Sequence, residues 1–209
     1  MNKLPDKTVE RLSQYRRSLN NQLAKGKTHI FSHEIANLLH ITPVQVRRDI
    51  MLIGYSGTLR KGYDIKEMVE LIGKIIDTDS GLKMAVIGMG NLGKAFIHYL
   101  FEKRTKLKIV AAFDVNPDKV DKKYADVQCY HLDQLEEIIN NEGITIGIIT
   151  TPPEVASPMA DRLKKAGVKG ILNFTPRALS PREGVYLEEY DMITSLEKVA
   201  YFVKQKDTN

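Results

Sequence analysis

The chain has 209 residues, of which 43% are hydrophobic, and a formal net charge of +5, a composition typical of a folded protein with one large or two small domains. No run approaches the roughly 20 apolar residues that cross a bilayer, the polar start lacks the apolar core of a secretion signal, and one cysteine, Cys129, excludes an internal disulfide and a cysteine-rich metal site. We therefore expect a cytoplasmic protein without membrane contact, in which Cys129 is a packed thiol.

The charge is unevenly distributed along the chain. Residues 1–62 hold 11 Lys and Arg against 4 Asp and Glu, whereas the remaining residues hold 20 against 22. A basic first part beside a slightly acidic second part indicates that the first part meets a polyanion. A solvated basic surface is the alternative.

Residues 8–25 are predicted to form a helix that ends at Gly26, because apolar residues recur broadly on one face with basic residues between them. The apolar residues are Val9, Leu12, Leu19 and Leu23, and the basic residues are Arg11, Arg16 and Arg17. Ser32 is then a suitable N-cap for a second, short helix. This second helix carries Ile35, Ala36, Leu38 and Leu39.

The third predicted helix has a clear start. Thr42 is placed to cap it, and Pro43 occupies the first helical position, where a missing N–H costs nothing. Val46, Ile50 and Ile53 recur at helical spacing and predict a packed face. The polar residues expected near the opposite side are Thr42, Gln45, Arg47 and Arg48.

Two short helices joined by a tight turn, the second basic near its N-terminus, are typical of a helix-turn-helix that reads the major groove. Gln45 can pair with adenine and Arg48 with guanine, although either arginine of this helix could bind phosphate instead. Residues 54–63 have the glycine and basic content of a two-stranded wing. The alternative is a small helical domain whose arginines are solvated. The residues assigned to DNA contact are Ser32, Thr42, Gln45, Arg47, Arg48, Arg60 and Lys61.

An apolar strand beginning at Leu82 runs into the pattern G-x-G-x-x-G, and Asp114 closes a second strand 21 residues beyond Gly93. In a dinucleotide site of this kind Gly88 allows a tight turn, Gly90 lets the backbone approach a pyrophosphate, and Gly93 permits close packing of the following helix.

The carboxylate of Asp114 also indicates which dinucleotide is bound. A carboxylate at this place accepts hydrogen bonds from the ribose 2′-OH and repels a 2′-phosphate, which favours NAD(H) over NADP(H). Lys119 would weaken this preference if it reached the site. We expect it to be a solvated charge.

Five motifs in this order resemble the Rex family of redox-sensing transcriptional repressors over nearly the whole chain. They are residues 46–49 (VRRD), the wing ending Gly62-Tyr63, residues 88–93 (GMGNLG), residues 111–114 (AAFD) and residues 170–176 (GILNFTP). The resemblance implies an α/β fold with a winged helix-turn-helix domain at residues 1–80, a Rossmann-type doubly wound parallel sheet at residues 81–192 and a C-terminal domain-swapped helix at residues 193–209. It also implies a homodimer that binds palindromic operator double-stranded DNA and is released by NADH.

Two later segments complete the implied cofactor site. Residues 144–150 read as a buried strand and residues 170–174 as a further short strand, and ligands of open α/β sheets bind at the carboxyl ends of such strands. A proline-rich strand exit and a turn cap at Asn173 are the plainer alternatives. The residues assigned to NAD(H) are Gly88, Met89, Gly90, Asn91, Leu92, Gly93, Asp114, Thr151, Pro152, Asn173 and Phe174.

The resemblance further implies a switch and a dimer. Asp191 would pair with Arg17 across subunits in one state and with Tyr99 in the other, so that the ligand biases two packings. Residues 195–204 are too apolar for a free helix and would be exchanged between protomers. The alternative is that this helix docks on its own domain.

Two places depart from the family pattern. Leu59-Arg60 stands where the wing usually has an Arg-Gly pair, which puts the operator preference in doubt. Ser157-Pro158 stands where a glutamine is typical, which puts cofactor affinity or NAD/NADH discrimination in doubt.

Three other functions compete with a repressor. An NAD-dependent oxidoreductase is disfavoured, because only 95 residues follow Asp114 and neither His98 nor His131 lies in a recognisable catalytic arrangement. A coenzyme A-type nucleotide-binding regulator keeps the glycine loop but changes the ligand. A purely structural role would make both the basic face and the glycine loop accidental. We expect a regulator that is not an enzyme and holds no metal.

Overall fold

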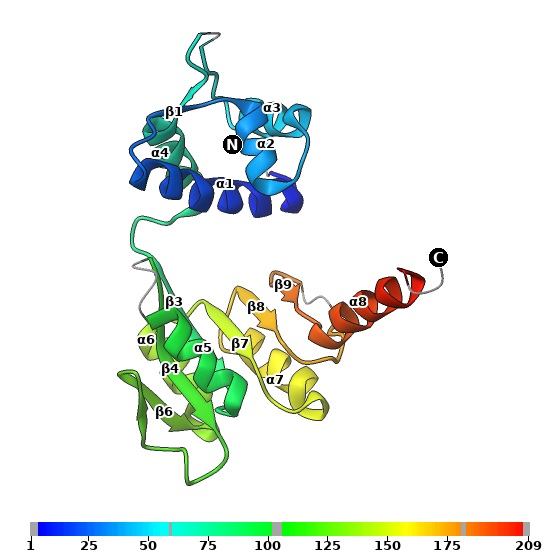
Figure 1. The fold of residues 1–209 in the computed structure, drawn as a ribbon. Helices are drawn as coiled ribbons and strands as arrows, with labels where there is room; N and C mark the ends of the chain where they lie inside the picture. Colours follow the sequence, from blue (N-terminus) through cyan, green and yellow to red (C-terminus); the bar gives the residue numbers. More distant parts are fainter. Residues whose placement is uncertain (1–3, 59, 102–105, 181–182, 207–209) are drawn as a thin grey trace. The chain divides into compact units, whose positions relative to one another are not determined.

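The computed structural model describes residues 4–58, 60–101, 106–180 and 183–206. The chain divides into two compact units, Met1–Asp79 and Ser80–Asn209 (Figure 1). Within the described ranges, no helix combines the length and the apolar character needed to cross a membrane. Each unit has its own hydrophobic core.

The first unit is helical with one small antiparallel sheet. The sheet pairs β1 with β2, with Ile30 opposite Tyr63, and so joins the start of the helix-turn-helix to the end of the wing. The elements are α1 (Asp6–Ala24), β1 (His29–Ile30), α2 (Ser32–Leu39), α3 (Pro43–Leu52), β2 (Tyr63–Asp64) and α4 (Ile65–Ile76).

Helix α1 buries part of the face that was predicted, since Leu12 and Leu19 are fully buried. Val9 and Leu23 are 39% and 38% exposed, so the prediction that they share the packed face is wrong. Thr8 and Tyr15 take the places of Val9 and Leu23 on the buried face. Tyr15 is fully buried because its hydroxyl has a charged partner inside the unit, described below.

Helix α4 was missed by the sequence analysis, although its signals are present. Asp64 caps it, since the Asp64 carboxylate accepts a hydrogen bond from the Glu67 N–H at 2.9 Å. Ile65, Met68 and Ile72 recur on one face, and all three are fully buried in the core shared with α1. This helix closes the core of the first unit.

The second unit is a doubly wound α/β fold, as predicted. Seven strands of the described chain form one sheet in the order β5-β6-β4-β3-β7-β8-β9, all parallel except β5. They are β3 (Leu82–Ile87), β4 (Leu107–Asp114), β5 (Lys123–Tyr124), β6 (Val127–His131), β7 (Ile146–Ile149), β8 (Gly170–Asn173) and β9 (Tyr186–Glu189). The strand order reverses between β3 and β7, the point at which ligands of such sheets bind.

Helices cover both faces of this sheet. Helix α5 (Asn91–Phe101) packs Ile97 onto Met84, Val86 and Ala112 on one face. On the other face α6 (Leu135–Glu142) and α7 (Pro153–Lys165) pack onto Ala85, Ile87 and Phe113. A short 3₁₀ turn, η1 (Leu132–Gln134), precedes α6. Cys129 is a packed thiol, as predicted: it is fully buried, and burial raises its pKa to about 11.

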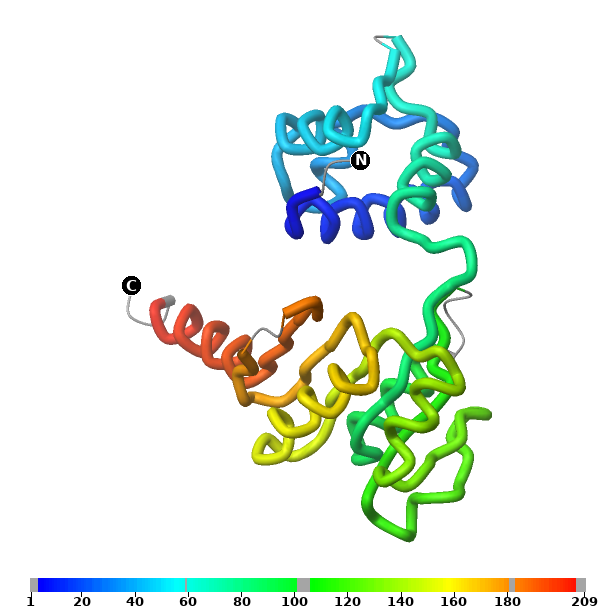
Figure 2. The backbone as a smooth tube through the Cα atoms, turned by 180° about the vertical axis from the view of Figure 1, so that it is seen from behind, coloured from blue at the N-terminus to red at the C-terminus, as the bar shows by residue number. Residues whose placement is uncertain are grey.

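The last helix, α8 (Met192–Lys206), continues outward past the β9 edge of the sheet (Figures 1 and 2). Its apolar side chains do not pack on the second unit. Their exposed fractions run from 55% to 68% for Met192, Ile193, Leu196, Val199, Tyr201, Phe202 and Val203. Docking of this helix on its own unit, the alternative from the sequence, is therefore not observed.

Candidate DNA and nucleotide sites

The start of α3 is built as predicted. The Thr42 hydroxyl accepts a hydrogen bond from the Gln45 N–H at 3.2 Å, and Pro43 follows at the first helical position. Val46 and Ile50 are buried, whereas Arg47 and Arg48 are exposed on the opposite side. The helix thus presents two cations from a rigidly packed base.

A buried carboxylate that the sequence analysis missed fixes α3 on α1. Asp49 is fully buried and forms two bonds with the Arg11 guanidinium, at 2.6 and 2.8 Å, and one with the Tyr15 hydroxyl at 2.7 Å. The Gln45 amide donates to the same carboxylate at 3.0 Å. Burial favours the neutral acid, but these donors hold the pKa of Asp49 below its ordinary value. The Gln45 amide therefore points partly inward rather than wholly to the opposite side.

Ser32 does not cap α2. The cap position belongs to Phe31, whose N–H donates to the Glu34 carboxylate at 2.9 Å, and Ser32 is the first residue of the helix. The Arg47 guanidinium donates to the Ser32 hydroxyl at 3.1 Å. The structure thus brings together two residues assigned to DNA contact, one from each helix of the motif.

The wing is shorter than the predicted two-stranded ribbon. Thr58 and Gly62 exchange two backbone hydrogen bonds of 2.8 Å as an isolated bridge, and the wing then runs directly into β2. Arg60 and Lys61 are exposed at this turn. The departure noted at Leu59 lies outside the described residues.

The three glycines of the loop between β3 and α5 have different surroundings. Gly88 has φ +98°, and an added Cβ would lie 2.9 Å from the Thr150 carbonyl oxygen, while a Cβ on Gly93 would lie 2.2 Å from that of Gly88. Both glycines are thus required by the protein itself. A Cβ on Gly90 would meet nothing within 4 Å, so the packing of the protein does not require a glycine there, and its role in binding a ligand stays a prediction.

The first turn of α5 follows this open position. Asn91 is exposed and Leu92 half-buried, and Lys94 makes the first backbone bond of the helix, to the Gly90 carbonyl at 3.1 Å. The N–H groups at the start of a helix attract a phosphate charge. Met89 is fully buried and contributes its backbone rather than its side chain to the loop.

Asp114 lies at the end of β4, held by three donors. Its carboxylate accepts the Met89 N–H at 2.7 Å, the Asn116 N–H at 2.9 Å and the Lys119 ammonium at 3.0 Å. The prediction that Lys119 is a solvated charge is therefore wrong. Burial of Asp114, which is 8% exposed, favours the neutral acid, but the three donors outweigh it and lower its pKa. The side chain is ionised and oriented beside the glycine loop.

The exit of β7 adds a polar group to this loop. The Thr150 hydroxyl donates to the Gly88 carbonyl at 2.8 Å and so attaches the β7 exit to the glycine turn. The next hydroxyl, on Thr151, is buried and has no hydrogen-bond partner among the described residues. Because a buried orphan hydroxyl is costly, this atom is a candidate ligand contact. Pro152 is exposed and precedes α7.

Asn173 organises the next loop. Its amide oxygen accepts the Thr175 N–H at 3.0 Å, and its amide nitrogen donates to the Arg177 carbonyl at 2.9 Å and the Glu189 carboxylate at 3.1 Å. With these bonds Asn173 stabilises the turn, which was one of the two alternatives from the sequence. Contact of its side chain with a cofactor stays a prediction. Phe174 is half-buried between two aromatic rings, Phe96 at 5.0 Å and Tyr190 at 5.5 Å between centroids.

Comparison with known proteins gives the same two functional regions. The family described as "Putative DNA-binding protein N-terminus" matches residues 3–50, and the family described as "CoA binding domain" matches residues 79–177. A curated relative from Anoxybacillus flavithermus, "Redox-sensing transcriptional repressor Rex", is 41% identical over 97% of this chain and 95% of that protein. A relative of the same name from Listeria welshimeri is 38% identical over 97% of this chain and 94% of its own length. The chain belongs to the Rex family.

Solved structures of Rex-type repressors match over the full chain. The "Crystal structure of RSP in complex with beta-NAD+ and operator DNA" has a TM-score of 0.91 at 30% identity and covers 100% of this chain and 96% of that one. The "Crystal structure of RSP in complex with beta-NADH" has a TM-score of 0.86 at 30% identity, with 100% and 98% covered. The winged-helix and Rossmann-type folds expected from the sequence are confirmed.

The residues implied as the Rex switch lie on exposed parts of the two units. Arg17 is exposed on α1, and Tyr99 is 63% exposed on α5. Asp191 caps α8: its carboxylate accepts the Ile193 N–H at 2.9 Å and the Thr194 hydroxyl at 2.6 Å. The Thr194 hydroxyl and the helix N–H groups lower the pKa of Asp191. Its pairing with Arg17 or Tyr99 stays a prediction.

Proposed function

We propose that this chain is an NADH-responsive transcriptional repressor, which binds palindromic operator DNA as a homodimer and leaves it when NADH occupies the glycine loop. The observation that carries the proposal is the conjunction, in one Rex-family chain, of a capped basic helix and a glycine loop whose middle position, Gly90, faces open space. The Rex-type repressor RSP, similar over the full chain, has been crystallised with NAD⁺ and operator DNA and with NADH.

The residues present fit NAD(H). Gly90 leaves room for a pyrophosphate above the start of α5, and the ionised Asp114 suits a ribose diol with a free 2′-OH, although the Lys119 ammonium bonded to Asp114 weakens its discrimination against a 2′-phosphate. The Thr151 hydroxyl offers a buried donor, and the Thr151 side chain lies beside Gly88 of the glycine loop. The bound dinucleotide would supply the redox signal, since its nicotinamide ring is neutral when reduced and cationic when oxidised. The protein's own residues bind and orient it.

Dimer formation is supported by α8. A helix with seven large apolar side chains exposed by more than half needs a covering surface, and exchange between two protomers provides one. A two-fold dimer carries two recognition helices related by symmetry, which is why its operator is expected to be palindromic. Because its target is DNA, the protein is proposed to act in the cytoplasm.

The test is a DNA mobility shift with a palindromic operator, selected from random duplexes by the full-length protein. NADH is titrated in the presence and absence of NAD⁺. Release of DNA by NADH supports the proposal, and unchanged DNA affinity at NADH concentrations that fill the site contradicts it. Linkage sets a second requirement: operator DNA must weaken NADH binding by the same factor as NADH weakens DNA binding.

The matched variant for this test is Gly90→Val. Its Cβ would have no protein atom within 4 Å and its side chain would enter the space proposed for the ligand, so it should abolish NADH binding while leaving DNA binding intact. A Gly90→Val protein that is still released by NADH would show that the glycine loop is not the NADH site.

Coenzyme A is the second candidate ligand, because the matching family model of residues 79–177 is named for it. Competition calorimetry with NADH, NAD⁺ and coenzyme A distinguishes the two. An enzyme is tested by incubating the protein with NADH and carbonyl compounds, and steady turnover would contradict the proposal that the chain is a regulator only.

A further inference from the structure

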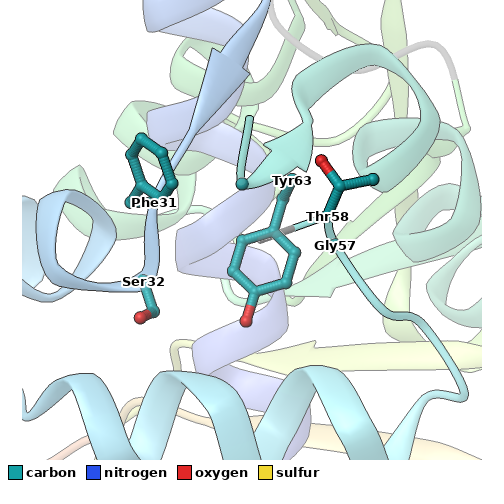
Figure 3. Close-up of a pocket in the computed structure, with 6 residues that line it drawn as sticks. Phe31, Ser32, Gly57, Thr58 and Tyr63 are labelled. Carbon is teal, nitrogen blue, oxygen red and sulfur yellow. The ribbon is translucent and has the colours of Figure 1, made fainter. Parts of the chain in front are cut away.

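A crevice of about 220 Å³ lies between the start of α2 and the base of the wing (Figure 3). Its lining residues are Phe31, Ser32, Gly57, Thr58, Gly62 and Tyr63. The hydroxyls of Ser32 and Tyr63 stand on opposite walls and point in the same direction in Figure 3. Of these residues, only Ser32 was assigned to DNA contact from the sequence.

Backbone packing keeps the crevice narrow at its base. Gly62 has φ +78°, and a Cβ there would lie 2.5 Å from the Ile30 carbonyl oxygen. A Cβ on Gly57 would lie 2.5 Å from the Gly62 carbonyl oxygen and 2.7 Å from the Tyr63 ring. The two glycines therefore let the wing lie directly against β1 and hold Tyr63 in place, so the walls of the crevice are preformed.

Three donors lie in or beside this crevice: the hydroxyls of Ser32 and Tyr63 line it, and Arg47 is bonded to Ser32. The Arg47 guanidinium donates to the Ser32 hydroxyl at 3.1 Å, which leaves the hydroxyl proton of Ser32 available for another acceptor. The Tyr63 hydroxyl has no hydrogen bond within the described part of the chain. Burial raises the pKa of Tyr63, while the charge of Arg47 opposes this, so Tyr63 remains a protonated donor near neutral pH. Each of the three groups therefore keeps a donor for an acceptor that enters the crevice.

The lining of the crevice is uncharged, and Arg47 brings a positive charge beside it. Glu34, the carboxylate on the first turn of α2, is occupied by the Lys27 ammonium and by the Phe31 N–H. Arg47 carries its charge at 3.1 Å from Ser32 with no carboxylate partner in the described ion pairs. A small, singly charged anion with several acceptor oxygens satisfies these donors.

We propose that this crevice binds one phosphodiester group of the DNA backbone, with the Tyr63 and Ser32 hydroxyls and the Arg47 guanidinium as its donors. The inference rests on the proposed DNA-binding function and assigns Tyr63 to it as a binding residue. A contact to phosphate fixes the register of the recognition helix on the duplex and reads no base. Tyr63 therefore sets how α3 sits in the groove, while Arg48 remains exposed for base edges.

The test compares Tyr63→Phe with Tyr55→Phe in the full-length protein. The Tyr55 ring lies 6.2 Å from that of Tyr63, but its hydroxyl is bonded to the Glu67 carboxylate at 2.9 Å, outside the crevice. Each substitution removes one hydroxyl and keeps the ring. Affinity is measured for the selected operator and for variants in which one phosphate at a time is replaced by an uncharged methylphosphonate.

Tyr63→Phe should bind about five- to tenfold more weakly to operator and to unrelated duplexes alike, the loss of one hydrogen bond. The wild-type protein and Tyr55→Phe should lose affinity at one methylphosphonate position per half-site, and this loss should be smaller in Tyr63→Phe. Ser32→Ala should reduce the loss at the same position, which gives a second readout if Tyr63→Phe folds poorly.

The outcomes separate this inference from the proposed function. If the wild-type protein binds operator, but neither Tyr63→Phe nor Ser32→Ala changes affinity or the methylphosphonate pattern, the crevice is not a phosphate site and the repressor function stands. A change in base preference without a change at any phosphate also overturns the inference. If the wild-type protein binds no duplex, both fail.

Discussion

The two functional regions of this chain are prepared for their ligands in opposite ways. In the first unit the Asp49 carboxylate is satisfied by donors inside the protein, and the cations proposed to contact DNA, Arg47 and Arg48, are exposed on the outside of the helix. In the second unit the glycine loop is shaped by the backbone, and polar capacity is left unused at the Thr151 hydroxyl. A polyanion is met by solvated charge on a fixed base, whereas a dinucleotide is met by a preformed cradle.

This difference indicates which positions of each region tolerate substitution. At the DNA face, side chains can change without disturbing the fold, because they make few contacts with it. At the glycine loop, stability and binding depend on different glycines in the same six-residue motif, because the protein occupies the space around two of them and leaves the third open.

The largest expected effect separates those glycines. Gly93→Val should lower the free energy of unfolding of the second unit by about 3 to 5 kcal/mol, because its Cβ would lie 2.2 Å from a backbone carbonyl that cannot retreat. Gly90→Val should change the same quantity by less than about 0.5 kcal/mol. Urea denaturation of both variants measures the contrast, and equal destabilisation would mean that the loop has no position kept open for a ligand.

A smaller effect is expected in the first unit. Asp49→Asn keeps the shape of the side chain but removes its charge, and should cost about 2 kcal/mol, as for hydrogen bonds to a charged group. Its pH dependence has a definite sign. Since the folded pKa of Asp49 is lowered, its contribution is fully present above the unfolded pKa of about 3.9 and is lost as the pH falls through the folded pKa.

Unfolding of the first unit at a series of pH values from 7 to about 2.5 checks this sign. Stability should fall in acid for the wild-type protein, and part of that fall should be missing in Asp49→Asn. Identical acid profiles would remove Asp49 from the groups that stabilise the unit.

The smallest effect is expected on the outside of α3. Arg48→Ala should weaken operator binding by about tenfold if it makes a base contact, with unchanged stability and unchanged NADH affinity. Mobility shift and calorimetry measure the two affinities. An unaltered DNA affinity would place Arg48 outside the interface.

Much of this organisation could be predicted from local patterns. The cap at Thr42, the proline that follows it and the glycine loop with its acidic partner Asp114 each span few residues or a fixed spacing, and all three appear in the structure. The apolar C-terminal helix was recognised in the same way, because its pattern is periodic.

The contacts that were missed are set by the folded chain rather than by a local sequence pattern. Tyr15 and Asp49 are separated by 34 residues and no period connects them, so the sequence gave no sign of their contact, although the spacing of Tyr15 from Leu12 and Leu19 indicates a buried ring. Lys119 was predicted to be solvated because no sequence spacing links it to Asp114. The turn that follows β4 brings its ammonium group to the Asp114 carboxylate. The wing is short because β2, which follows it, pairs with β1. Within the wing, the strand pairing is limited to the bridge between Thr58 and Gly62 among the described residues.

The exposed helix α8 has a consequence for how operator binding depends on the amount of this protein in the cell. If a second copy of the chain must cover the exposed apolar side chains of α8, the dimer rather than the monomer binds the operator. At high dilution, occupancy of the operator then rises with the square of the monomer concentration. The number of copies in the cell then determines, together with the coenzyme ratio, the threshold at which transcription resumes.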